Sequence, residues 1–379
     1  MLGCAENYTC WITEQGGEKV LWEVPSASRV KWRRSRDEVS AGQVDMLPSM
    51  CCDWIGSVET VKHELHIYRD GVPVWEGPIV RLEYQKDLVQ IFAADILWVP
   101  ARRVLERGYS YAYPNVRKVG YAIQKLLIDE CFAQNTSGSG ALWDEDRWNM
   151  FGHIHWVRGP DDPRTSSVRV PYSATIWELV DNFARRGGID CTVIGRDIYH
   201  FDTHLAWMQL PDLNVENIGG WPRVTEFGNE TYTRVFTTNN LGTASVAVAD
   251  KDYVSYYGLV DDLISQDTEA TVNYPPSKEE LAGMLEQSKR SLQGSIPPPV
   301  RVMLPENSTL MPSTPWDIND IVPGAWFTIN VPEGLCRAMS DEQKIDHMDV
   351  TFEAPNYETV QLTSISPPSK KVLPDDTVQ

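Results

Sequence analysis

The sequence of 379 residues has no apolar run long enough to cross a bilayer. The best candidate, from Ile91 to Val99, is interrupted by Asp95. We therefore expect no stable membrane insertion. The first ten residues, MLGCAENYTC, have neither a basic start nor an apolar stretch, so we expect no signal peptide.

Cysteine is scarce and basic residues are few. Seven cysteines, an odd number, in a large chain without a secretion signal predict reduced thiols rather than a disulfide framework. The net charge is −19, and residues 241–379 alone hold 9 basic and 21 acidic side chains. This composition disfavours nucleic-acid binding, which needs clustered Lys and Arg. It suits a surface that nucleic acid passes without binding, and solubility alone is the simpler interpretation.

The sequence also lacks the usual patterns of catalysis. We find no Ser–His or Cys–His arrangement that indicates a nucleophile, and no glycine loop that would hold a phosphate. We therefore predict a protein that is not an enzyme, with no catalytic residue, no cofactor and no metal site.

Two groups of possible metal ligands stay open. His153 and His155 would share one face of a strand, with Asp161-Asp162 within reach of a loop. Cys4, Cys10 and the Cys51-Cys52 pair would suit zinc or an iron–sulfur cluster if the segments converged. Adjacent cysteines point to opposite sides of a strand, so buried thiols are the preferred interpretation. The same rule separates His63 from His66.

What the sequence does contain is a run of short strands, clearest in residues 61–105. Residues 61–69 alternate as a half-buried strand does, and Asp70-Gly71 predicts a tight turn. The return strand is expected to end its regular pairing at Gly77-Pro78. Two further strands are then expected, from residue 79 to 84 and from 88 to 93.

Upstream, residues 9–24 predict another hairpin, turning at Gln15-Gly16-Gly17, and strands follow at 30–34 and 43–47. These elements are enough to close a small antiparallel barrel, which we assign to residues 1–105.

An α+β insert is expected at residues 106–210. It comprises a helix over 116–131, a polar loop at 133–170 with a short strand near residue 155, and a helix that begins with a capping box at Thr175 and Glu178. A hairpin with strands 189–194 and 198–201 completes it. The acidic run Asp144-Glu145-Asp146 in the loop lies beside tryptophans, as in sites that cleave sugars.

Strands return in residues 211–366, which we assign to a second β-barrel module with an internal helix at 277–293. That helix starts with a capping box at Ser277 and Glu280 and stops before three prolines. Residues 367–379 are expected to be a flexible C-terminal tail. The predicted fold class is thus mainly β, with two small antiparallel barrel modules and an α+β insert.

Several short segments of the sequence resemble segments in the proteins of a known family. Val30 to Arg34 with Asp37 to Ala41 is similar to its opening strand pair, and His63 to Ile79 resembles its hairpin. Ser255 to Gly258, Ile296 to Val300 and Ile321 to Phe327 are similar to its later part. The family is that of the hub proteins at the tail tip of long-tailed bacteriophages, in particular the minor tail proteins of siphophages that infect actinobacteria.

The resemblance implies a tail-hub-like fold and a structural role in the virion, with assembly in the host cytoplasm. It implies a homotrimeric baseplate or tail-tip hub that closes the tail tube, bound to the distal tail ring, the tape measure protein and other minor tail proteins. DNA would leave through its lumen without specific binding. The rival hypothesis is a tail-tip protein that binds carbohydrate or cleaves cell-wall glycan, motivated by the Trp-rich acidic loop at 141–156.

Overall fold

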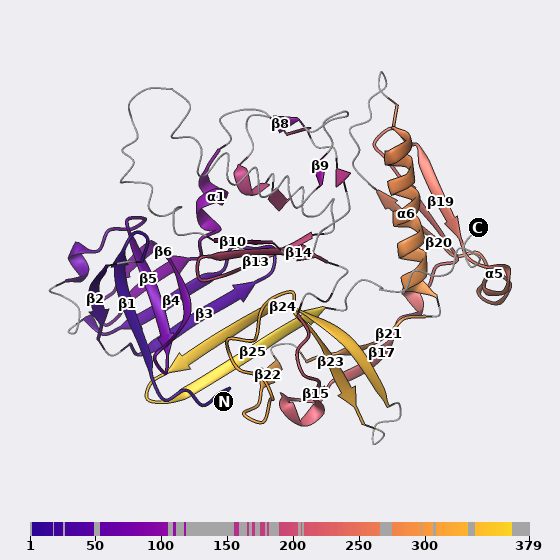
Figure 1. Ribbon diagram of the computed structural model, residues 1–379. Coiled ribbons are helices and arrows are strands. Elements are labelled where there is room, and N and C mark those ends of the chain that lie inside the picture. Colours follow the sequence, from indigo (N-terminus) through magenta and orange to yellow (C-terminus); the bar gives the residue numbers. More distant parts are fainter. Residues whose placement is uncertain are drawn as a thin grey trace. The chain divides into compact units, whose positions relative to one another are not determined.

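The computed structural model describes three long stretches of the chain, residues 2–104, 189–265 and 275–365. Their gaps are residues 18, 26, 49–53, 204–205, 207, 297, 306–307 and 333–337. Between the first two stretches it describes residues 109–110, 117–118, 155–158, 165–166, 169–170, 175–178 and 180–181. Two compact units emerge, one of residues Met1–Trp221 with Leu304–Ile365 and one of Pro222–Met303 with Ser366–Gln379. Figure 1 shows both units as ribbons coloured along the sequence.

The first unit contains a large sheet, to which the beginning of the chain contributes seven strands. Their order in the sheet, from the interior outward, is β3-β4-β7-β6-β5-β1-β2, and all neighbours are antiparallel. The elements are β1 (Tyr8–Glu14), β2 (Val20–Val24), β3 (Arg29–Ser35), β4 (Ala41–Met46), β5 (His63–Arg69), β6 (Val72–Tyr84), β7 (Val89–Ala94), the 3-10 helix η2 (Ile55–Ser57) and helix α1 (Trp98–Arg102).

The hairpin of β5 and β6 forms as the sequence predicts, with one difference. Asp70 and Gly71 both have positive φ, 49° and 79°, as a tight turn between twisted strands requires. β6, however, does not end at Pro78. It pairs with β5 up to Pro78 and with β7 from Ile79 onward, so the proline marks a change of partner within one continuous strand.

The end of the chain adds strands to the same sheet. β24 pairs with β23 along its first half, and with β3 on the same side along its second half; β25 covers its other side. In Figure 1 the yellow strands β24 and β25 lie beside the indigo strand β3. The elements from this part are β15 (Leu213–Asn214), η6 (Val215–Asn217), β16 (Ile218–Gly219), β22 (Ser308–Leu310), β23 (Trp326–Val331), β24 (Met339–Glu353) and β25 (Tyr357–Ile365).

The described part of the expected α+β insert is built on a hairpin. β13 (Ile189–Ile194) and β14 (Asp197–Asp202) are antiparallel, and β10 (His155–Arg158) joins β14 in parallel. Thr175 and Glu178 form the predicted capping box, with N···O distances of 2.7 and 3.1 Å. The short strands are β8 (Tyr109–Ser110), β9 (Arg117–Lys118), β11 (Thr165–Ser166) and β12 (Arg169–Val170). Of the helix expected at 116–131, Arg117–Lys118 is strand and the remainder lies outside the described residues.

The second unit contains a three-stranded sheet with a helix packed on it. Helix α6 packs on the sheet β19-β18-β20, where the buried side chains Val235, Ala247 and Leu292 form its core. The helix begins with the predicted capping box of Ser277 and Glu280. The elements are β17 (Arg223–Glu226), η7 (Gly228–Glu230), β18 (Arg234–Thr238), β19 (Ala244–Val248), α5 (Lys251–Tyr257), β20 (Asp261–Ser265), α6 (Lys278–Ser295) and β21 (Val300–Met303), which pairs with β17.

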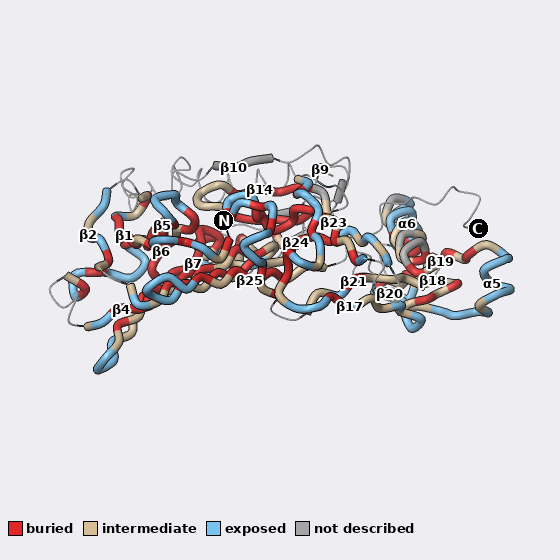
Figure 2. The backbone as a smooth tube through the Cα atoms, turned by 90° about the horizontal axis from the view of Figure 1, so that it is seen from below, coloured by how far each residue is buried: buried red, intermediate tan, exposed pale blue. Residues whose placement is uncertain are grey.

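The fold is therefore mainly β with antiparallel sheets, as predicted. Buried residues follow the strands of the large sheet (Figure 2). Its core includes Trp32, Leu65, Trp326 and Phe327, each at most 2% exposed. Within the described residues, no helix combines the length and the apolarity that crossing a membrane requires.

The compact units do not follow the four segments expected from the sequence. Strands assigned to the two barrel modules share one sheet, because β24 pairs with β3, while β18 to β20 and α6 gather in another unit. The closure of two barrels within residues 1–105 and 211–366 remains a prediction. The tail at 367–379 lies outside the described residues.

Gly77, where β6 changes partner, offers a test of this packing. A Cβ at that position would lie 1.9 Å from the carbonyl oxygen of Ala94, a backbone atom that no rotamer change can move away. We expect Gly77→Ala to lower the free energy of unfolding by about 3 kcal/mol, at the upper end for overpacked cores.

The measurement is urea denaturation, with Gly56→Ala as control, because a Cβ at Gly56 meets nothing within 4 Å. Equal stability of the two variants would contradict the close approach of β6 to β7.

Candidate functional site: charged contacts around the inserted hairpin

The β13–β14 hairpin is attached to the large sheet at its base by backbone and side-chain hydrogen bonds. The amide of Asp37 donates to the carbonyl of Cys191 at 2.8 Å, and the amide of Cys191 donates to the Asp37 carboxylate at 2.7 Å. Asp37 has φ 58°, a conformation that Asp tolerates better than most residues. The Thr192 hydroxyl donates to the carbonyl of Ser35 at 3.2 Å.

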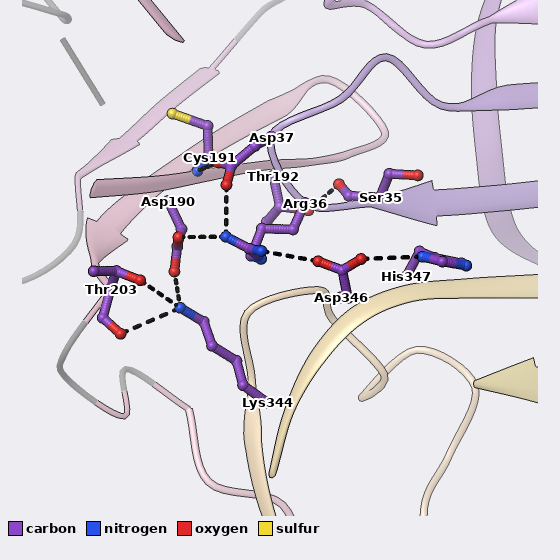
Figure 3. Close-up of polar contacts among 10 residues, drawn as sticks. All are labelled: Ser35, Arg36, Asp37, Asp190, Cys191, Thr192, Thr203, Lys344, Asp346 and His347. Carbon is purple, nitrogen blue, oxygen red and sulfur yellow. Dashed lines mark hydrogen bonds and ion pairs between the residues drawn. The ribbon is translucent and has the colours of Figure 1, made fainter. Parts of the chain in front are cut away.

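Arg36 is the centre of this base (Figure 3). One terminal nitrogen of its guanidinium, Nη1, lies 2.7 Å from a carboxylate oxygen of Asp37 and 2.7 Å from one of Asp190. The other, Nη2, lies 2.9 Å from Asp346 on β24. One side chain therefore joins β3, β13 and β24, three segments that are distant in sequence.

Lys344 completes the base from β24. Its ammonium group is fully buried, pairs with Asp190 and donates to the hydroxyl of Thr203 at 2.9 Å. Figure 3 shows its side chain reaching from β24 to the residues that flank the hairpin. We name Arg36, Asp37, Asp190, Lys344 and Asp346 the base cluster.

The base cluster has a strongly perturbed electrostatic environment. Burial, followed by the charge of Asp190, raises the pKa of Asp37 to about 7, although Arg36 and the Cys191 amide act in the opposite direction. Burial lowers the pKa of Lys344. Burial and the neighbouring carboxylates raise the pKa of the Cys191 thiol well above its usual value, so this thiol is a poor nucleophile. The arrangement is suited to holding the hairpin on the large sheet through buried ion pairs.

A second group of charges receives the tip of the hairpin. Arg196 in the β13–β14 turn pairs with the fully buried carboxylate of Glu64 on β5, and its Nε lies 3.8 Å from Glu76 on β6. His66 lies between the two carboxylates, with Nδ1 3.0 Å from Glu76 and Nε2 3.7 Å from Glu64. We name Glu64, His66, Glu76 and Arg196 the tip cluster.

Two buried arginines hold the rest of the first unit together. Arg69 makes two hydrogen bonds to Glu358 on β25, at 2.7 and 2.9 Å, and the Tyr8 hydroxyl donates to the same carboxylate at 2.7 Å. Arg34 donates to the backbone carbonyls of Ile318, Ile321 and Val74. Burial lowers the pKa of Arg34 to about 10. Both side chains connect early strands to the end of the chain.

Of the residues weighed from the sequence as metal ligands, the structure describes Cys4, Cys10 and His155, so neither candidate group is tested as a whole. Cys4, Cys10 and Cys191 are free thiols, and burial raises the pKa of Cys10 to about 12. Cys51, Cys52 and His153, as well as the acidic loop residues 144–146, lie outside the described residues. Within the part that the structure describes, no three His, Cys, Asp or Glu side chains group as metal ligands. His63 and His66 contact different groups, as expected from the strand pattern.

Neither the base cluster nor the tip cluster was predicted from the sequence. The residues of the base cluster stand up to 310 positions apart, and no local spacing links Arg36 to Asp190 or Asp346. One signal was present, because Arg36 and Asp37 lie in the polar turn expected after the strand at 30–34.

Comparisons with known proteins agree with this architecture. No protein-family model matches the sequence, and no curated protein matches it significantly. Among solved structures, the 43 kDa tail protein of prophage MuSo2 from Shewanella oneidensis is similar with a TM-score of 0.57 and 12% identity, over 96% of this chain and 99% of that one.

Two further tail proteins are similar to the same degree. The prophage tail protein gp18 from Listeria monocytogenes EGD-e gives a TM-score of 0.55 at 10% identity, over 97% of this chain and 96% of that one. The tail protein from Neisseria meningitidis MC58 also gives 0.55 at 10% identity, over 94% and 95% of the two chains. At these identities the likeness shows the fold: this chain has the tail-hub-like, mainly β fold of these tail proteins.

The base cluster makes a direct prediction for Asp190→Asn. The substitution keeps the shape of the side chain but leaves the buried Lys344 without its carboxylate, so we expect the unfolding free energy of the first unit to fall by about 3 kcal/mol. Urea denaturation followed by tryptophan fluorescence measures this change.

Glu353→Gln is the matched control, since Glu353 lies on β24 in a half-exposed pair with Arg29 at 3.3 Å. We expect its effect to stay within about 0.5 kcal/mol. If Asp190→Asn costs no more than the control, the base cluster does not hold the hairpin.

Proposed function

We propose that this chain is a structural protein of a phage tail, a homotrimeric hub at the tail tip or baseplate that closes the tail tube. The observation that carries the proposal is the likeness in fold to three tail proteins, which extends over more than nine-tenths of every chain compared. A fold can host unrelated functions, so the proposal rests on this likeness together with the open strand edges and the acidic charge of the chain.

The open ends of the large sheet support assembly with other subunits. In the described residues, the strand order ends at β2 on one side and at β16 on the other. Val20 at the start of β2 is 49% exposed. Exposed strand edges pair readily with other chains, and symmetric contact with a neighbouring subunit is an ordinary way to cover them.

The charge of the chain supports the role of the lumen. Residues 241–379 hold 21 acidic and 9 basic side chains, and a ring of three copies would hold three times this excess of acidic charge. Lined with carboxylates, a channel repels the phosphates of DNA and lets DNA pass without specific binding. A basic lumen with the acidic residues on the outer rim would contradict this part of the proposal.

The partners of the proposed hub follow from its place. It would contact the distal ring of the tail tube, the tape measure protein and other minor tail proteins, in a siphophage virion assembled in the host cytoplasm. It would act through these contacts and not as an enzyme. The resemblance of its sequence segments to minor tail proteins of siphophages that infect actinobacteria supports a role as a minor tail protein.

The oligomeric state is the first test. We expect the purified chain to run as a trimer in light scattering and to form threefold rings in negative-stain micrographs. We expect Val20→Lys to weaken the trimer, because a charge on an edge strand opposes further pairing. Val72→Lys is the control, since Val72 is 47% exposed at the start of β6, which pairs with β5 and not with β2.

A chain that stays monomeric at every concentration tested would overturn the trimer. Equal weakening by both lysine variants would remove β2 from the interface.

The place in the virion needs a separate experiment. We expect antibodies against the chain to label the tip of the tail in electron micrographs of intact particles. Label along the tube or on the capsid, or no chain in purified particles, would overturn the assignment to the tail tip.

A further inference from the structure

The two attachments of the β13–β14 hairpin each hold one carboxylate more than they hold permanently charged cations. In the base cluster, Arg36 and Lys344 supply two cations to three carboxylates. In the tip cluster, Arg196 supplies one cation to Glu64 and Glu76. The tip differs in that a histidine, His66, faces both of its carboxylates, so the tip is one positive charge short only while His66 is neutral.

The position of His66 suits it to supply the missing charge. Its two ring nitrogens face one carboxylate each: Nδ1 lies at hydrogen-bond distance from Glu76, 3.0 Å, and Nε2 lies at ion-pair distance from Glu64, 3.7 Å. Both nitrogens carry a proton toward a carboxylate only when the imidazole is protonated. The His66 ring is closely surrounded on one side. A Cβ on Gly17 would lie 2.9 Å from the ring, and the side chain of Glu64 is fully buried.

We propose that His66 is a proton-operated latch for the tip of the β13–β14 hairpin. Protonated, it neutralises Glu64 and Glu76 together with Arg196, and the tip stays docked on β5 and β6. Neutral, it leaves the buried carboxylate of Glu64 and the partly exposed carboxylate of Glu76 against one arginine, and the tip separates from the sheet while the base remains attached through Arg36 and Lys344.

The pKa shifts of His66 and Glu76 have the directions that the latch requires. Burial by itself lowers the pKa of His66, but its hydrogen bonds and the charges of Glu64 and Glu76 outweigh burial and raise it. Burial raises the pKa of Glu76, and the hydrogen bond and charge of His66 bring it below its usual value. A histidine with a raised pKa contributes stability that is complete below about pH 6.5 and is lost as the pH rises through the pKa of the docked state.

The charged groups facing His66 come from three elements: Glu64 beside it on β5, Glu76 on β6 and Arg196 in the hairpin turn. Tyr68 follows two residues later on β5, and burial and Glu76 raise its pKa further from neutrality. Burial raises the pKa of Asp37 in the base cluster to about 7. The hydrogen exchange of the base is therefore measured separately from that of the tip.

Hydrogen exchange at each pH, corrected for the intrinsic rate, tests the latch. The tip is read from the amides of residues 15–17 and 194–198, and the base from those of 189–192. Between about pH 5.5 and about pH 8.5 we expect the protection of the tip to fall about tenfold for each unit by which docking raises the pKa of His66.

Three variants separate a latch from a merely structural histidine. Glu76→Gln removes the surplus carboxylate, so we expect its tip to stay protected at alkaline pH and to lose its pH dependence. His66→Gln should hold the tip at the alkaline level of protection throughout. His63→Gln is the control on the same strand: burial lowers the pKa of His63, so the pH dependence of the tip should persist.

The proposal is overturned by either of two results. One is a tip protected equally at both ends of the pH range in the unmodified chain. The other is a Glu76→Gln variant with the pH dependence of the unmodified chain. An NMR titration of the His66 ring in the unmodified protein decides the matter if a variant does not fold, since a pKa at or below the ordinary value of about 6.5 rules out the latch.

Discussion

The pairing of β24 with β3 is the contact on which the first unit depends. It aligns Val350 with Trp32 in an antiparallel ladder between opposite ends of the chain. Because β24 also holds β23 and β25, this one ladder brings the last strands into the sheet that the first strands begin. Ion pairs of Arg33 with Asp349, and of Arg36 with Asp346, run alongside it. Without the ladder, the early and late strands would be separate sheets with unpaired edges.

The alternation of β3 explains how one short segment serves several contacts. Arg33 and Arg34 are neighbours on the strand and point to opposite sides, so Arg33 pairs with β24 while Arg34 enters the core. Arg36 lies just beyond the strand end, where it turns toward the hairpin. Arginine suits all three positions, because its fixed fork of donors binds carboxylates and several carbonyls at once.

The sequence predicted local structure well because its causes are local. The turn at Asp70-Gly71 and the capping boxes at Thr175 and Ser277 depend on side chains within three residues of the backbone groups that they serve. Strand partners depend on the whole chain, so β24 could be recognised as a strand but not as the neighbour of β3. Both charge clusters were invisible for the same reason, since Arg196 and Glu64 are 132 positions apart.

Backbone hydrogen-bond ladders and buried ion pairs have different roles in this fold. Ladders of backbone hydrogen bonds need only the strand pattern, which tolerates wide change in side chains, and this agrees with a shared fold at 10% to 12% identity. Buried ion pairs do the opposite: they add little net stability, since desolvation offsets attraction, but a misplaced partner is costly. The ladders thus determine which fold forms, and the charges, together with the hydrogen bonds at its base, determine where the inserted hairpin sits on it. A hairpin positioned by charge can also be moved by a proton, which apolar packing would not allow.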